Sequence, residues 1–116
     1  MIIKSQDQIQ QVPVEMEGAV GAKVQVLLGP EDHAPTMAMR IFELAPTGHT
    51  PYHAHAFEHE VMILNGDIAV VTPQGEIPVK PGDVLLVLPQ ETHQFKNCSD
   101  TDNARFMCLV PIAYQA

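Results

Sequence analysis

Turn-forming residues interrupt this chain so often that a long helix has no room between them. The 116 residues include ten prolines and seven glycines, and both residue types favour turns over helix interiors. The runs between them are short and apolar, as in Met37–Leu44 and Val84–Leu88. No window of about a dozen residues repeats its apolar positions with the 3.6-residue period of a helix. Many short strands separated by regular turns predict an all-β sandwich or barrel.

The turn residues also set the limits of the expected strands. Asn65-Gly66 is typical of a hairpin turn, and Pro73–Glu76 and Pro81–Asp83 mark the next two turns. We expect residues 97–103 to form a solvated hairpin loop, and residues 1–20 to form an edge strand or an arm exchanged with a partner. The predicted strands are Val24–Leu28, Met37–Leu44, Val61–Leu64, Ile68–Thr72, Ile77–Lys80, Val84–Leu88, His93–Asn97 and Phe106–Pro111.

Length and charge narrow the class of protein. Residues 1–116 are expected to fold as a single domain, with 46% hydrophobic and 17% charged residues, a balance typical of globular proteins. The net charge is −8 and the six Lys and Arg residues are scattered. We therefore expect no binding to nucleic acid or to an anionic membrane surface. The start of the chain lacks a signal-like apolar stretch, and Cys98 and Cys108 are the only cysteines. These features predict a soluble cytoplasmic protein with free thiols.

Four of the six histidines lie where one metal ion could collect them. His53, His55 and His59 fall within seven residues, and His93 comes from a separate predicted strand. Residues two apart on a strand share a face, so His53 and His55 can point at the same ion. Imidazole is the commonest side-chain ligand for first-row transition metals. The sequence therefore predicts a mononuclear metal site.

Two motifs around these histidines resemble the cupin superfamily. The first is a glycine, a spacer, His-x-His, a glutamate and a final glycine. It is matched by Gly48, His53, His55, Glu60 and Gly66, with both spacers shorter than usual. The second motif is matched by Gly82, Pro89, His93 and Asn97, with Glu91 in place of a glycine. The resemblance covers residues 48–97 and implies a single-domain jelly-roll barrel.

The run Glu58-His59-Glu60 resembles a smaller group of single-domain cupins that bind manganese through four histidines. By that resemblance the metal ligands are His53, His55, His59 and His93, while Glu58 and Glu60 accept hydrogen bonds around them or keep the local field negative. The commoner cupin arrangement has three histidines and the motif glutamate, which would put Glu60 in place of His59. Adjacent strand residues face opposite ways, so we expect only one of the two to be a ligand. We favour His59, although the apolar run Val61–Leu64 does not reveal which face is inner.

Four neutral imidazoles would leave the charge of a divalent ion uncancelled and two octahedral positions open. Manganese or iron is favoured, and nickel, zinc and copper also suit a nitrogen-rich site. Phe106 and Cys108 share a strand face and are expected to line the substrate pocket. Arg40, within an apolar run, lies either at the solvated barrel rim or near the metal, where it would orient an anionic substrate group.

Together these features favour a small-molecule metalloenzyme of oxygenase type, which cleaves a carbon–carbon bond with dioxygen or peroxide. Glu60 or Glu58 is the expected proton-transfer group, and Arg40 the expected cation of the site. The alternatives are a cupin isomerase or lyase, a non-catalytic module that binds a metal or metabolite, and a metal that only stabilises the fold. The resemblance to small cupins also implies a homodimer paired through an edge strand, and the apolar faces of Val24–Leu28 and of the last strand, Phe106–Pro111, fit that expectation.

Overall fold

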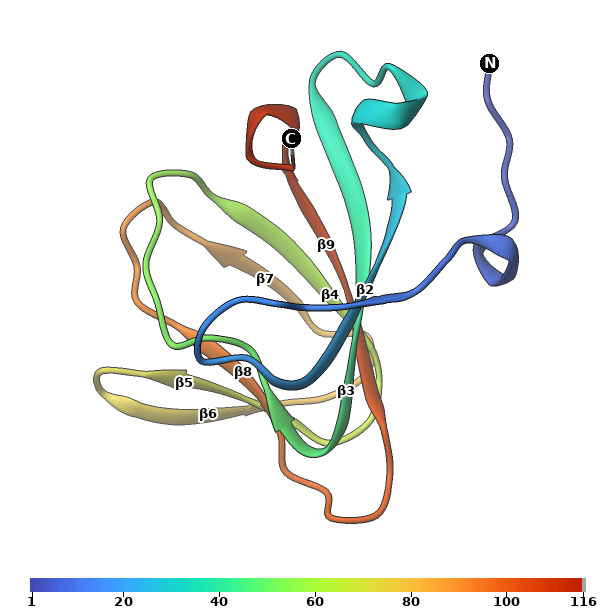
Figure 1. The fold of residues 1–116 in the computed structure, drawn as a ribbon. Coiled ribbons are helices and arrows are strands. Elements are labelled where there is room, and N and C mark those ends of the chain that lie inside the picture. The colour runs from blue at the N-terminus through green and yellow to red at the C-terminus, as the bar shows by residue number, and fades with distance from the viewer. Residues whose placement is uncertain (116) are drawn as a thin grey trace.

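The computed structural model describes residues 1–115, and a single curled sheet forms most of it (Figure 1). The all-β prediction is confirmed. The helices among the described residues are three short 3-10 turns, and none is long and apolar enough to cross a bilayer. They are η1 (Gln6–Gln8), η2 (Pro30–Asp32) and η3 (Ile112–Tyr114). The strands are β1 (Val12–Pro13), β2 (Val20–Leu28), β3 (Met37–His49), β4 (His59–Asn65), β5 (Ile68–Thr72), β6 (Gly75–Val79), β7 (Val84–Val87), β8 (Gln94–Asn97) and β9 (Ala104–Pro111).

The long strand β3 joins the two parts of the sheet. The strand order is β6-β5-β8-β3-β9-β4-β7, and β2 pairs with both β1 and β3. Most of β3 pairs with β9, whereas its last residue, His49, pairs with Lys96 of β8. The sheet therefore curls into an open barrel, with the β5–β6 hairpin and β7 at the two ends of this strand order (Figure 1).

Strand β3 differs most from its predicted limits, because it continues past Leu44 to His49. Pro46 lies in an irregularity of the ladder, where Val20 pairs with His49 but Ala22 pairs with Leu44. A bulge tolerates proline because the ladder there is already interrupted. Gly48 makes the bulge possible: a Cβ at this position would lie 2.8 Å from the Val20 carbonyl oxygen. The first motif glycine thus allows β3 to pass close to β2.

The barrel interior is filled by alternate side chains of each strand. Along β9 the buried residues are Ala104, Phe106, Cys108 and Val110, with their neighbours less buried. Along β4 the alternation buries His59, Val61 and Ile63. The core cluster is completed by side chains from the other strands, among them Ala38, Leu44, Ile68, Val70, Val87 and Phe95. Two polar side chains, His59 and Cys108, thus belong to the same inward rows as the apolar core.

The weakly patterned N-terminal residues contribute one short edge strand. Val12 pairs with Val24 and Pro13 with Lys23, so β1 extends the sheet beside β2. Residues before it run away from the barrel (Figure 1), where Lys4 forms an ion pair with Asp32 at 2.9 Å. The exchange of this arm with a partner stays a prediction.

Candidate metal centre

Imidazole rings from three parts of the chain converge inside the barrel. His53 and His55 lie between β3 and β4, His59 begins β4, and His93 immediately precedes β8. The ligand atoms of His53, His55 and His93 all lie within 4.8 Å of one another, close enough to hold one metal ion. His59 adds a fourth nitrogen, because its Nε2 lies 2.5 Å from Nε2 of His55. The structure thus brings together all four predicted ligands.

Two of these residues are fixed to each other through the backbone. The His53 amide donates to the His93 carbonyl oxygen at 3.1 Å, and the His93 amide donates back at 2.9 Å. This isolated bridge ties the irregular loop after β3 to the start of β8. Both side chains are therefore placed by main-chain hydrogen bonds and not only by side-chain packing.

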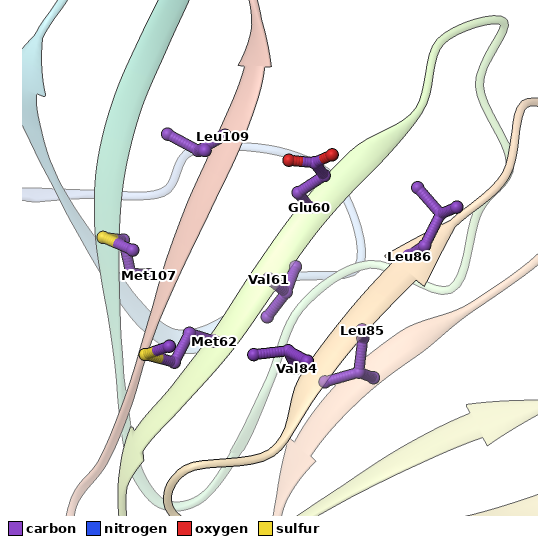
Figure 2. Close-up of a pocket in the computed structure, with 8 residues that line it drawn as sticks. All are labelled: Glu60, Val61, Met62, Val84, Leu85, Leu86, Met107 and Leu109. Atoms are coloured by element: carbon purple, nitrogen blue, oxygen red, sulfur yellow. The ribbon is translucent and has the colours of Figure 1, made fainter.

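Glu60 lies on the opposite face of β4 from His59. His59 is 9% exposed, whereas Glu60 and Glu58 are both exposed. Figure 2 shows Glu60 on the outer surface of the sheet, beside Leu86 and Leu109. The structure therefore does not bring Glu60 or Glu58 to the imidazoles, in contrast to the expected role of these carboxylates in proton transfer. The reason is the two-residue alternation of a strand, which gives only one of two neighbours an inward side chain.

The hydrogen bonds of the rings identify which nitrogens are free to bind a cation. Nδ1 of His55 lies 3.0 Å from the Phe57 carbonyl oxygen, and Nδ1 of His93 lies 2.8 Å from the Glu91 carbonyl oxygen. A carbonyl can only accept, so each Nδ1 carries hydrogen, and Nε2 is the nitrogen that offers a lone pair when the ring is neutral. Nδ1 of His59 instead lies 2.9 Å from Sγ of Cys108.

Burial favours the neutral form of His53, His55 and His59. It lowers the pKa of His59 to about 3, with repulsion from His55 and Arg40 adding to the effect. Burial also lowers the pKa of His53 and of His55. Desolvation penalises the charged form of a histidine, so the rings offer lone pairs at neutral pH. Neutral nitrogen donors that converge in this way fit a divalent transition-metal ion.

The rings open into an apolar cavity of about 260 Å³. Apart from the histidines, Thr50, Arg40 and Cys108 are its polar lining residues within the described chain, and Phe106 lines it as expected. The remaining lining is apolar or aromatic: Val14, Met16, Phe42, Pro51, Phe57, Phe95 and Tyr114. A larger hollow of about 530 Å³ lies on the outer face of β4, β7 and β9, but among residues 1–115 Glu60 is the only ionisable residue that lines it. The imidazoles and Arg40 therefore line the smaller cavity and not the larger hollow.

Arg40 lies in the wall of this cavity and not at a solvated rim. It is half-buried, and its Nη2 donates to Sγ of Cys108 at 3.2 Å. Its guanidinium carbon lies 4.8 Å from the ring centre of Phe42. Arg40 is the only Lys or Arg that lines the cavity within residues 1–115. The position of Arg40 thus corresponds to the second of its two predicted locations, near the imidazoles.

Sequence reasoning missed Phe57 and Tyr114 as pocket residues. Their rings stack with centres 3.5 Å apart, and Phe57 also stacks on His55 at 4.1 Å. Phe57 lies in the irregular segment before β4, and Tyr114 lies in the final 3-10 turn, where no strand periodicity assigns a face. The one available signal was the position of Phe57 between two predicted metal ligands.

The chain is similar in sequence to a protein family and to a curated protein. Residues 40–110 match the family described as the cupin domain. The 1-methylthio-D-xylulose 5-phosphate methylsulfurylase of Rhodospirillum rubrum is 32% identical over 75 residues, which cover 65% of this chain and 47% of that protein. The chain therefore spans about half the length of this curated relative.

Solved structures extend the likeness to almost the whole chain. The polyketide cyclase RemF from Streptomyces resistomycificus superimposes with a TM-score of 0.90 at 27% identity, covering 97% of this chain and 80% of that one. A predicted oxalate decarboxylase from Thermotoga maritima gives a TM-score of 0.82 at 22% identity, covering 96% of this chain and 99% of that one. The second likeness shows a shared fold.

Proposed function

This chain belongs to the cupin domain family, and on that premise we propose that it is a metalloenzyme acting on a small apolar substrate. One divalent cation, manganese or iron by preference, would be held by His53, His55, His59 and His93. The observation that carries the proposal is the convergence of these imidazoles on an apolar cavity. When bound, such an ion supplies a Lewis acid for a substrate oxygen and, if redox-active, a partner for dioxygen or peroxide.

The cavity favours a flat, conjugated substrate that carries an enol, phenol or carbonyl oxygen. Its volume of about 260 Å³ suits a small molecule, and its aromatic walls, including Phe106 and the Phe57–Tyr114 stack, can contact a planar ring. Arg40 would orient an anionic oxygen through its N–H groups. The polyketide cyclase at 27% identity, by its name, acts on a polyketide, and we take this as support for a substrate of this class.

A phosphorylated sugar is less compatible with the same walls. The methylsulfurylase relative is named for such a substrate. Phosphate recognition usually draws on several cations or on a helix N-terminus. Arg40 is the only cationic side chain among the described lining residues. We therefore place the substrate outside the sugar phosphates.

For the reaction, we propose oxidative cleavage of a carbon–carbon bond with dioxygen or peroxide. An apolar lining excludes bulk water from reactive species. The described lining holds no Asp or Glu, which disfavours an isomerase that depends on a carboxylate for proton transfer. Metal-assisted ring closure of a polyketide-like substrate is the second candidate, and the likeness to the polyketide cyclase favours it.

One experiment tests the function and separates the two reactions. Protein purified without added metal is analysed for bound elements, reconstituted with manganese or ferrous iron, and given enols, phenolics and β-diketones with and without dioxygen. Oxygen uptake and cleavage products that require dioxygen would support the oxygenase. A cyclised product formed equally well without dioxygen would support ring closure. Saturable binding without product would favour a binding module, and failure to bind any metal would overturn the proposal.

We further propose that two copies of the chain pair through β7 and the outer face beside it. Strand β7 ends the strand order, so its free edge pairs with no strand of the described chain. The side chains of Val84, Leu86 and Leu88 are 71%, 55% and 52% exposed. An unpaired edge next to an apolar face is best covered, and a second copy can cover both because two-fold pairing joins identical surfaces.

A further inference from the structure

We propose that Cys108 is a positioning residue that fixes the hydrogen of His59 on Nδ1 and links this metal ligand to Arg40. The inference rests on the proposed metal site for its functional consequence. The structural observation is that Sγ of Cys108 contacts three groups: the Arg40 guanidinium, the His59 ring and the Leu109 carbonyl oxygen. No role in bond making or breaking is assigned to the thiol.

The sheet register places Cys108 between the two residues that it would join. On one side β9 pairs with β3, and Cys108 lies directly opposite Arg40. On the other side β9 pairs with β4, and Cys108 lies opposite Val61. His59 is two residues before Val61, in the diagonal position that long side chains reach across a sheet. Cys108 is 2% exposed, so its sulfur meets these neighbours without competition from bulk water.

The hydrogen-bonding capacity of the three neighbours assigns the hydrogens. Arg40 can only donate, and its Nη2 lies 3.2 Å from Sγ. The thiol hydrogen has a separate acceptor, the Leu109 carbonyl oxygen at 3.9 Å. In the metal-loaded site Nε2 of His59 binds the ion, so the ring hydrogen is on Nδ1 and the sulfur, 2.9 Å away, accepts it. The lone pairs of both Nε2 atoms, of His59 and of His55, then point to the same ion, which their close approach requires.

The acceptor for Nδ1 of His59 differs in kind from the acceptors for Nδ1 of His55 and His93. His55 and His93 each donate to a carbonyl oxygen two residues away in their own segment. His59 depends on a side chain from another strand, and the same sulfur also receives Arg40. Loss of the sulfur would free His59 to change tautomer and would remove an acceptor from Arg40. The metal ligand and the substrate-orienting cation would be disturbed together.

A pair of substitutions separates positioning from simple packing. Cys108→Ser keeps a small acceptor at this position, whereas Cys108→Val keeps an apolar side chain and removes the acceptor. If Cys108 only fills space, Val should preserve the site better than Ser. If Cys108 positions His59, Ser should preserve it and Val should not. Thermal melting of both variants verifies that each is folded before the comparison.

The primary readout is the position of the hydrogen on each histidine in zinc-loaded protein, measured by two-bond nitrogen–proton NMR of ¹⁵N-histidine-labelled samples. We expect hydrogen on Nδ1 of His59 in the wild type and in Cys108→Ser, and a mixed or Nε2-protonated ring in Cys108→Val. His55 and His93 should keep hydrogen on Nδ1 in all three proteins and so serve as internal controls. A wild-type His59 with hydrogen on Nε2, or an unchanged His59 in Cys108→Val, would overturn the proposal.

The second readout is metal affinity, measured by competition of each protein with a chelator for zinc. We expect Cys108→Ser to stay within about threefold of the wild type and Cys108→Val to bind about 10- to 100-fold more weakly, the usual range for loss of a group that orients a ligand. Equal affinities for all three proteins would overturn the link to metal binding. If no protein bound metal, the proposed function itself would fail, whereas three zinc-loaded proteins that all keep hydrogen on Nδ1 of His59 would overturn only the role of Cys108.

Discussion

The inner and outer faces of β4 place opposite chemistry on neighbouring residues. On the inner face His59 is buried in the same row as Val61 and Ile63. On the outer face Glu60 and Met62 are exposed, among the apolar side chains of β7 and β9 (Figure 2). A slip of one residue in register would exchange the two faces. The comparison teaches that strand register, more than motif content, decides which polar group meets the metal.

Solvation explains why this assignment suits the fold. A buried histidine can remain neutral, and the lowered pKa of His59 keeps it so. A carboxylate in the same position would have to lose its hydration or take up a proton. On the outer face Glu60 keeps contact with water. The inner face thus holds the neutral donor, and the outer face holds the solvated Glu60 side chain.

The largest expected effect is the loss of metal binding on substitution of His59, compared with substitution of its neighbour Glu60. His59→Ala should reduce divalent-metal affinity at least about a hundredfold and bring turnover to background, because a ligand is lost. Glu60→Gln should leave both within about threefold, because its side chain lies outside the cavity. Elemental analysis and chelator competition provide the measurement. The opposite ranking of the two variants would exclude His59 as the fourth ligand.

The apolar residues of the same strand provide a second test. Ile63→Ala should destabilise the protein by about 3 kcal/mol, because Ile63 is 1% exposed and its loss leaves a cavity. Met62→Ala should cost less than about 1 kcal/mol in a monomeric sample, because the side chain is partly solvated. Denaturant unfolding of both variants gives the comparison. Equal losses would mean that the two faces are buried alike in solution.

Acid should destabilise the metal-free protein, because His59 on the inner face of β4 takes up a proton less readily when the chain is folded. The pKa of His59 is about 3 in the folded state and about 6.5 when unfolded. The unfolded chain therefore binds the proton first, and the stability present above pH 6.5 is lost as the pH falls toward 3. His59 alone should remove about 2 kcal/mol between pH 7 and pH 5.

Chemical denaturation at several pH values measures this slope. His59→Gln should flatten it, and Glu60→Gln, the matched variant on the outer face, should keep the wild-type slope over this range. A wild-type slope in His59→Gln would assign the acid sensitivity to other groups.

The smallest effect concerns the outer face itself. If two copies pair through β7, Leu86→Ala should weaken the dimer about tenfold, as expected for an apolar side chain within an interface. Ile77→Ala, at an exposed position on β6, should leave the dimer unchanged. Sedimentation at several protein concentrations gives the dissociation constants. A monomeric wild type would contradict the proposed pairing.

Local signals in the sequence predicted most of the strands. Turn residues flank β5 on both sides, and its predicted limits, Ile68–Thr72, agree with the structure. The extension of β3 through Pro46 could not be predicted in this way. It depends on the close approach of β2 at Gly48, which is a contact between distant residues. Local propensity stops a strand at proline, and the tertiary bulge overrides it.

The sequence predicted the parts of the candidate site that depend on the spacing of residues along the chain. It could not predict the parts that depend on how the strands pair. His53 and His55 follow from two-residue spacing, and the structure places them together with His93. The choice between His59 and Glu60 required knowledge of the inner face, which the apolar run after them does not reveal. The contact between Arg40 and Cys108 joins residues 68 positions apart. That contact depends on the register of β3 against β9, which has no local signature.

The reciprocal main-chain bridge between His53 and His93 also bears on ion selectivity. Two donors anchored by backbone lose little further conformational entropy when an ion arrives, because folding has already ordered them. A preorganised pair of this kind adapts poorly to ions of different radius. The barrel should therefore discriminate among divalent cations by bond length and coordination geometry, and should capture a suitable ion without refolding.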